Sequence, residues 1–385
     1  MNAFLLRMKR FCGYVVGFVF FISGILKLMD PVGAGLVMKE YFQFLHIGFM
    51  SFADTFLGVL FASAETLIGA ALITGVWRKI VAIAAVALQG FFTFLTLILV
   101  IFQPQMDCGC FGEVIHLTHT ETFVKNIILL ALLLIYYIPE KHLGETKKKK
   151  YVSFGIVAVS AFAFSIYSLL YIPMEDFTDL HPGTSINRYS ETSSDAFEAA
   201  FVYEKDGKEE TFTLENLPDT TWTFVRTETK EKNQNKETAT VSIYDAEGNY
   251  ADSLLATGKI IVVTLYRPVA GEKETRRLNA FLDNVSKAGF TAMVLSTSEI
   301  AGVQAASYIC DYKTLITLNR SNGGAVYLND GFIIRKWAKK TLPDLPELAM
   351  LSDEDPTDTF IGRDTKVSLA FQGFLLYVFA VMLLL

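Results

Sequence analysis

Two cysteines separated by a single glycine are the residues of this sequence best placed to do chemistry. Cys108 and Cys110 lie in residues 106–113 (MDCGCFGE), a short polar stretch between two long apolar runs. Two thiols this close can close only a small ring, and a strained disulfide exchanges more readily than a structural one. Gly109 removes the side chain that would crowd this closure. The spacing therefore favours a redox-active dithiol as one interpretation.

Two other interpretations of the same cysteines stay open. The pair could be a local clip that shapes the loop, or two unconnected thiols packed under Phe111. Together with His116 and His119, the cysteines also form the pattern Cys-x-Cys-x5-His-x2-His, a set of soft ligands that zinc or copper(I) could use. This spacing differs from that of a zinc finger, so metal binding is the weaker alternative and no metal is expected.

Two charged residues within apolar runs are secondary candidates for a functional site. Glu65 lies near the middle of such a run, where a carboxylate is costly and marks a functional site by default. It could accept protons released by thiol oxidation, or pair with Lys27 near the end of the first apolar run. The alternative is a carboxylate that only locks helix packing, with neighbouring Ala and Gly residues that allow close approach.

The elements that must position these residues are membrane helices. Of the 385 residues, 52 % are hydrophobic and 32 are Phe, while the charged residues (19 %) are sparse before residue 140 and dense from 175 to 366. This asymmetry predicts a membrane half joined to a soluble half. The apolar runs predict transmembrane helices at residues 11–29, 52–75, 80–102, 123–138, 151–172 and 367–385.

The basic residues predict how these helices are oriented. They fall on every second connection, as Arg7, Lys9 and Arg10, then Arg78 and Lys79, then Lys141 and residues 147–150. The positive-inside rule places these clusters, and with them the N-terminus, in the cytoplasm. The predicted loop at residues 30–51, the cysteine loop and residues 174–366 would then share the outer face of the membrane, an environment in which a disulfide can persist.

Four stretches of the membrane half match a known family pattern. They are FISGILKLMDP (residues 21–31), AETLIGAALITG (64–75), DCGCFGEVIHLTHTET (107–122) and the pair Lys125-Asn126. Over about residues 11–140 the chain resembles the DoxX/MauE group of bacterial redox-associated membrane proteins, four-helix bundles whose MauE-type members carry a CGCFG-like loop after the third helix. The resemblance implies a bacterial inner membrane, whose outer face is the periplasm, and a role in periplasmic thiol chemistry or electron transfer, carried by Cys108 and Cys110.

The soluble half contains two patterns. Residues 174–257 predict short strands, and from residue 258 a buried strand (259–266), a helix (272–287) and a second strand (291–296) precede a hairpin that turns at Asp330-Gly331. This order resembles a thioredoxin-like domain over residues 258–340. Thiol catalysis of the usual kind is not expected there, because residues 267–272 (RPVAGE) stand where thioredoxins carry Cys-x-x-Cys.

Cys310 is the only cysteine of the soluble half. Its position between the second strand and the hairpin predicts a packing role. The alternative is a relay partner for Cys108 or Cys110, which requires Cys310 on the side of the domain that faces the membrane.

We therefore expect a polytopic α-helical membrane protein with a soluble α+β, thioredoxin-like domain that lacks Cys-x-x-Cys. The expected parts are a four-helix DoxX/MauE-like bundle (residues 1–140), a basic loop and fifth transmembrane helix (141–173), a periplasmic domain (174–366, with a β-rich extension at 174–257 and the thioredoxin-like part at 258–345) and a C-terminal transmembrane helix (367–385). Such a chain could serve as a component of a thiol–disulfide oxidoreductase. The alternative function is a non-catalytic membrane assembly or partner-binding factor in which the cysteine loop is a structural clip.

The expected partners follow from charge and location. They are the lipid bilayer and a periplasmic redox or client protein. The net charge of −6, with no basic stripe among the aromatic residues, argues against nucleic acid. No cofactor is identified from the residues, although a quinone could accept electrons from the dithiol.

Overall fold

The membrane half is a bundle of long apolar helices. The computed structural model describes residues 3–104, 106–138, 148–186, 197–205, 208–213, 218, 222–231, 238–267 and 271–384. Within them, five helices are long and apolar enough to cross a membrane. They are α1 (Ala3–Met29), α3 (Asp54–Thr74), α4 (Arg78–Phe102), α5 (His119–Tyr137) and α6 (Lys148–Leu170). The predicted polytopic helical membrane part is therefore confirmed.

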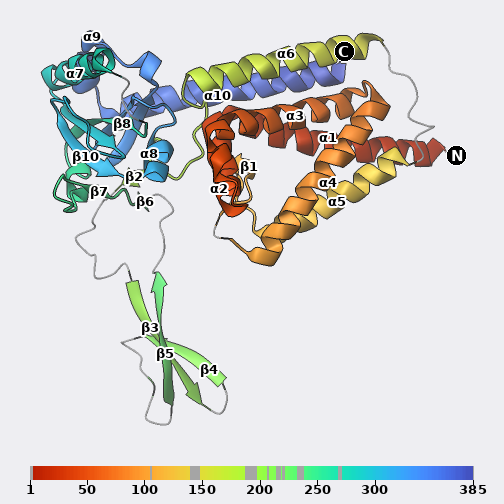
Figure 1. Ribbon diagram of the computed structural model, residues 1–385, viewed down its shortest axis with the longest axis horizontal. Helices are drawn as coiled ribbons and strands as arrows, with labels where there is room; N and C mark the ends of the chain where they lie inside the picture. The colour runs from red at the N-terminus through yellow and green to blue at the C-terminus, as the bar shows by residue number, and fades with distance from the viewer. Residues whose placement is uncertain are drawn as a thin grey trace.

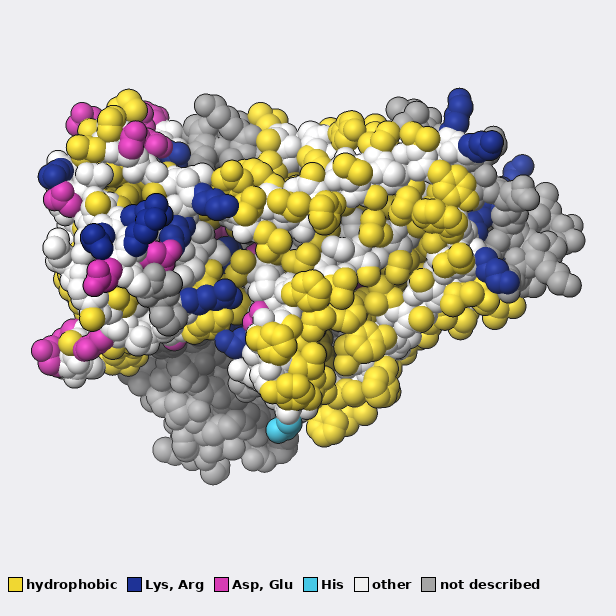
Figure 2. Space-filling model, turned by 45° about the horizontal axis from the view of Figure 1, so that its top comes forward, with side chains coloured by type: hydrophobic (Ala, Val, Ile, Leu, Met, Phe, Trp, Pro, Cys, Tyr) yellow, Lys and Arg dark blue, Asp and Glu magenta, His cyan; other side chains and the backbone are white. Residues whose placement is uncertain are grey.

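One end of this bundle collects the turns that carry basic residues. Trp77, in the turn between α3 and α4, packs edge-on against Tyr151 and Phe154 near the start of α6. Lys9 of α1 donates to the carbonyl oxygen of Ile138, just after α5. Both chain termini lie at this end, and Lys and Arg side chains gather there beyond a broad apolar surface (Figures 1 and 2). The side of the membrane that this end faces stays a prediction, and Lys141 and Lys147 lie outside the described residues.

A short helix, α2 (Pro31–Phe44), occupies part of residues 30–51, for which the sequence predicts a loop. Asp30 caps it by accepting a hydrogen bond from the backbone N–H of Gly33 (2.9 Å), and Pro31 stands at its first position, where no N–H is needed. A 3-10 turn, η1 (Gly48–Ala53), leads on to α3. Figure 1 shows α2 at the end of the bundle nearest the C-terminal domain.

The last helix, α10 (Pro356–Leu384), begins well before the expected boundary at residue 367. It runs beside α6 (Figure 1), where Phe164 stacks on Phe374 with ring centroids 4.7 Å apart and Ser153 Oγ donates to the Val381 carbonyl at 2.7 Å. Its apolar part, Leu369–Met382, is shorter than the five spanning candidates. The expected C-terminal transmembrane helix at 367–385 therefore stays a prediction.

The C-terminal domain is built on an eight-stranded sheet with the order β6-β2-β12-β11-β8-β9-β10-β7. Its strands are β2 (Ser185–Ile186), β6 (Thr238–Ala239), β7 (Ile243–Tyr244), β8 (Lys259–Leu265), β9 (Thr291–Ser296), β10 (Ala306–Cys310), β11 (Gly324–Asn329) and β12 (Phe332–Trp337). The central strand β8 (KIIVVTL) is apolar along nearly its whole length because both of its faces are buried. It pairs in parallel with β9 and antiparallel with β11.

Helices cover both faces of this sheet. α7 (Glu272–Lys287) and α9 (Leu345–Asp353) pack on one face, and α8 (Tyr312–Leu318) packs on the other. Two short 3-10 segments complete the domain, η3 (Asp252–Leu255) and η4 (Lys339–Thr341). The predicted β-α-β unit (β8-α7-β9) and the hairpin turning at Asp330-Gly331 are confirmed. Residues 268–270, in the connection where a thioredoxin motif would stand, lie outside the described residues.

A second, three-stranded sheet has the order β4-β3-β5. Its strands are β3 (Phe197–Lys205), β4 (Lys208–Thr213) and β5 (Thr223–Glu231), all antiparallel. They lie within the segment predicted to be a β-rich extension, and Figure 1 shows them apart from the eight-stranded sheet.

Candidate redox site

The two cysteines lie in the connection between α4 and α5, where β1 (Cys110–Glu113) is a short extended segment. Gly109 adopts φ +62°, and a Cβ built on it would lie 2.4 Å from Cγ1 of Val37 in α2. Only glycine fits this position without strain. α2 therefore packs directly on the glycine between the two thiols.

Two hydroxyl groups hold the loop by its backbone. Tyr41 of α2 donates its hydroxyl to the carbonyl oxygen of Cys108 at 3.2 Å. Ser23 of α1 lies 2.6 Å from the carbonyl oxygen of Cys110 and donates to it. The two cysteines are thus fixed from two different helices.

Cys108 faces a histidine. Its Sγ lies 3.0 Å from Nδ1 of His119, and Nε2 of the same ring lies 3.0 Å from the carbonyl oxygen of Pro104. A carbonyl only accepts, so Nε2 carries the ring proton and the Nδ1 lone pair faces the thiol. Thr118 and Glu121 form a capping box that starts α5 at His119, which fixes this ring beside the loop.

The surroundings of Cys108 favour its neutral thiol. Burial raises the pKa of Cys108, and the Thr122 side chain and the charge of Lys125 oppose this shift without cancelling it. Its side chain is buried, whereas that of Cys110 is half-buried. A thiol of raised pKa is a poor nucleophile alone, so chemistry at Cys108 requires a base within reach. His119 occupies that position.

Glu65 and Lys27 form the pair that the sequence offered as one alternative. Lys27 Nζ lies 2.5 Å from Oε2 of Glu65, with side chains 15 % and 6 % exposed. Ser23 Oγ lies 3.0 Å from Oε1 of the same carboxylate and also contacts the Cys110 carbonyl. Because one hydroxyl carries one proton, Ser23 donates to one of these acceptors at a time. It joins the buried ion pair to the cysteine loop.

A cavity of roughly 350 Å³ brings these groups together. Both cysteines, Lys27, Glu65 and Lys125 line one part of it. The rest of its wall is largely apolar, including Leu57, Phe61, Phe91, Phe92 and Leu95 of α3 and α4. A cavity of this size, apolar with a few convergent polar groups, is typical of small-molecule sites.

The remaining predicted site residues are placed differently. Among the four residues of the metal alternative, the structure records a contact between Cys108 and His119. Across the described ranges, no group of three or more His, Cys, Asp or Glu side chains is placed to hold a metal ion. His116 is exposed. The metal alternative stays a prediction that this geometry does not support.

Cys310 is a core residue of the C-terminal domain. It lies on β10 opposite Ile243 of β7, with 2 % of its surface exposed. Burial and the neighbouring Asp311 raise its pKa to about 12. Like the other three cysteines it is free. This burial agrees with the packing role and gives no support to the relay alternative.

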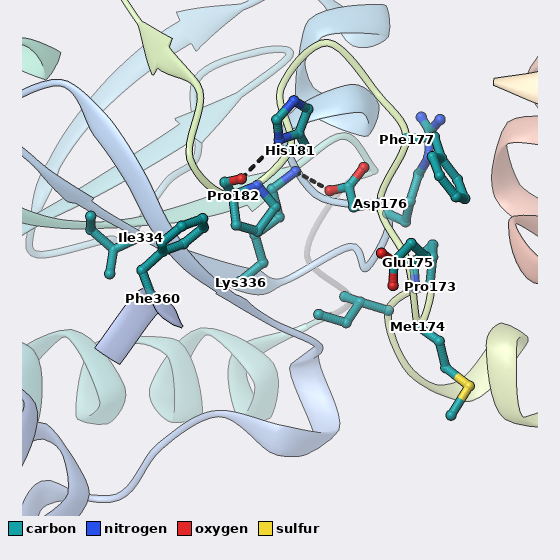
Figure 3. A pocket seen from close by; sticks show the side chains of 12 residues that line it. Pro173, Met174, Glu175, Asp176, Phe177, His181, Pro182, Ile334, Lys336 and Phe360 are labelled. Carbon is teal, nitrogen blue, oxygen red and sulfur yellow. Dashed lines mark hydrogen bonds and ion pairs between the residues drawn. The ribbon is translucent and has the colours of Figure 1, made fainter. Parts of the chain in front are cut away.

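A second cavity, of roughly 470 Å³, lies where the segment after α6 meets the C-terminal domain and α10 (Figure 3). Lys336 of β12 reaches Asp176 with 2.7 Å between Nζ and Oδ2. Burial alone would raise the pKa of Asp176, but the charge and hydrogen bond of Lys336, with those of Thr178, outweigh it and lower the pKa. The pair ties this segment to the sheet.

Fold and site together define a polytopic helical membrane protein whose bundle carries a two-cysteine loop, joined to a separate C-terminal domain. Residues 3–139 match the family model of the methylamine utilisation protein MauE. The chain is therefore similar to this family over its membrane half. Residues 197–233 match a domain of unknown function, DUF8463. No curated protein and no solved structure matches the chain.

Three functional contacts escaped the sequence reasoning. Ser23 lies one helical turn before Lys27, a spacing that places both on one face of α1 and could have indicated a shared site. The Thr118–Glu121 capping pattern could have placed His119 in the first turn of α5, next to the loop. The contact of Tyr41 with Cys108 had no comparable signal, because α2 was not recognised.

Proposed function

We propose that this chain is a redox-associated protein of the bacterial inner membrane in which Cys108 and Cys110 cycle between dithiol and disulfide on the periplasmic face. The observation that carries the proposal is the 3.0 Å contact between Cys108 Sγ and Nδ1 of His119, with the ring oriented by Pro104. A thiol beside a base that a third group orients can lose and regain its proton, as the formation and cleavage of a disulfide require. The MauE match over residues 3–139 supports the redox-associated role.

The proposed exchange oxidises a dithiol of a periplasmic partner or client protein. A partner thiol gives its proton to Nδ1 of His119 and attacks Sγ of Cys110, the less buried of the two sulfurs, and the Cys108 sulfur leaves with the bonding electron pair. His119 then gives that proton to the Cys108 sulfur. The second partner thiol then displaces Cys110, which takes up a proton. The partner ends as a disulfide and the chain as a dithiol, so two electrons and two protons have moved.

The C-terminal domain is proposed to be thioredoxin-like and to bind the partner without exchanging thiols itself. Its five consecutive strands β10-β9-β8-β11-β12, with the β8-α7-β9 unit, support this assignment. Residues 267–272 contain no cysteine. Val32 and Leu36 of α2 pack against the core of the domain, and Tyr41 of the same helix contacts Cys108. A partner held by the domain would therefore lie beside the helix that holds the cysteine loop.

The proposal is tested by trapping thiols with an alkylating reagent in intact cells. Cys108 and Cys110 are expected to appear partly as a disulfide with each other or with a partner, whereas Cys310 stays reduced. His119→Gln should slow the exchange by roughly 100-fold, the size of a lost acid–base group. His116→Gln, an exposed control three residues away, should change it little. If the pair never forms a disulfide, or if Cys108→Ser/Cys110→Ser retains full function, the structural-clip alternative replaces this proposal.

A further inference from the structure

The cavity beside the cysteines has two chemically different parts. Its polar part contains the two cysteines, the ion pair of Lys27 with Glu65 and the ammonium group of Lys125. Lys27 Nζ lies 5.5 Å from the centre of the Phe92 ring, and Lys125 Nζ lies 4.7 Å from that of Phe111. Both cations are therefore held next to aromatic rings and close to the thiols. An occupant of this part would meet positive charge and reactive sulfur.

The apolar part lies between two spanning helices. Phe61 of α3 and Phe91 of α4 stack there, with ring centroids 5.8 Å apart and planes 6° apart. Phe91 is 43 % exposed on the outer surface of the bundle, where lipid would lie. Because Phe91 also lines the cavity, the cavity wall reaches the lipid-facing surface at this residue, and an apolar occupant could enter there from the bilayer.

We propose that this cavity binds a lipid-soluble para-quinone with its ring at the cysteines and its tail between α3 and α4. This inference rests on the proposed dithiol/disulfide cycle and names its electron acceptor. A dithiol gives up two electrons and two protons on oxidation, and a quinone takes up both to become a hydroquinone. A lipid acyl chain would fill the apolar part, but it has no polar atom to meet Lys125, the Lys27–Glu65 pair and the thiols in the other part.

The redox step balances with these groups alone. A bond forms between Sγ of Cys108 and Sγ of Cys110, and both S–H bonds break. Two electrons pass to the quinone ring, whose two carbonyl oxygens become hydroxyl groups with the two protons. His119 takes the proton of Cys108 and passes it on toward the quinone, and Lys27 and Lys125 stabilise negative charge that develops on the ring oxygens. The disulfide is then ready to oxidise the next partner dithiol.

The test uses the full chain, reduced and placed in lipid nanodiscs. The probes are decylubiquinone and phylloquinone, whose rings are fully substituted so that a thiol does not add to them. One hydroquinone should form for each Cys108–Cys110 disulfide. Leu95→Trp, which fills the cavity, should slow this reaction by about tenfold or more because it displaces the ring or its tail. The matched control Leu97→Trp lies on the same helix at a position exposed outside the cavity.

A water-soluble oxidant separates this inference from the proposed function. Oxidised glutathione should form the disulfide in the wild type and in Leu95→Trp at similar rates, which also reports that the loop is intact. If Leu95→Trp slows the reaction with oxidised glutathione, Leu57→Trp takes its place as the cavity variant, because it fills the same cavity from α3. Disulfide formation with glutathione but with neither quinone, or equal quinone rates in the cavity and control variants, overturns the quinone site and leaves the dithiol cycle standing. No disulfide with any oxidant overturns both.

Discussion

Arg320 of the C-terminal domain and Asp30 at the start of α2 form a buried ion pair. The guanidinium donates to Oδ2 of Asp30 at 2.8 Å, and the two side chains are 3 % and 14 % exposed. The other oxygen of the same carboxylate accepts the N–H of Gly33 and caps α2. One side chain therefore fixes both the first turn of α2 and its attachment to the domain.

Breaking this pair should loosen α2. Arg320→Met leaves the Asp30 carboxylate buried without its cation, a loss expected to cost about 3 kcal/mol. Amide hydrogen exchange in α2 should accelerate by roughly 100-fold in consequence. The control is Lys313→Met, which removes the exposed Lys313–Glu40 pair (2.9 Å) and should cost less than about 1 kcal/mol. Equal exchange rates in the two variants would contradict a special role for Arg320.

The Lys27–Glu65 pair should behave as one unit. Either single substitution, Lys27→Met or Glu65→Gln, leaves one charge in the bundle without its partner and should lower the apparent Tm in detergent micelles. The double variant removes both charges and should lie closer to the wild type than either single variant, because the desolvation cost of both ions disappears. Additive losses in the double variant would show that the two side chains act independently.

The spanning helices could be predicted from the sequence because a bilayer requires each of them to be long and apolar on its own. α2 could not be predicted in this way. Its apolar residues are shared between two partners, with Val32 and Leu36 on the domain core and Val37 on the cysteine loop. Its pattern becomes intelligible only when both partners are in place. A segment of 14 residues with this composition gives no periodic signal of its own.

The candidate site was predictable in its residues but not in its pairing. Cys108 and His119 were both singled out, yet their contact requires the chain to reverse direction over eleven positions between α4 and α5. The pair of Lys27 and Glu65 depended on the packing of α1 against α3. Ser23, which joins that pair to the loop, is a common residue type with no chemical signature. Spacing along the chain identifies reactive groups, whereas tertiary packing decides which of them meet.

The thiol of Cys310 should be inert at neutral pH. Its pKa is raised from 9.0 to about 12, so at pH 8 the thiolate fraction is about a thousandfold lower than in the unfolded chain. Because the folded-state pKa is the higher one, burial of this thiol supports the fold below about pH 9, and that contribution is lost as the pH rises toward 12. Mass spectrometry after iodoacetamide treatment at pH 8 should find Cys310 modified only when the protein is unfolded first. Modification of the folded protein at the rate of Cys110 would contradict this burial.

Gly109 should be needed for the reactivity of the cysteine loop. Gly109→Ala forces a side chain into a backbone with φ +62° and into contact with Val37, so the loop must move away from α2. The backbone strain alone should cost about 1–2 kcal/mol. Disulfide formation between Cys108 and Cys110 with oxidised glutathione measures the effect, and it should slow.

Adding Val37→Ala should relieve the contact but not the strain, so the double variant should recover only part of the rate. Gly90→Ala in α4, where an added Cβ meets nothing within 4 Å, should leave the rate unchanged. A wild-type rate in Gly109→Ala would mean that α2 does not control the position of the two thiols.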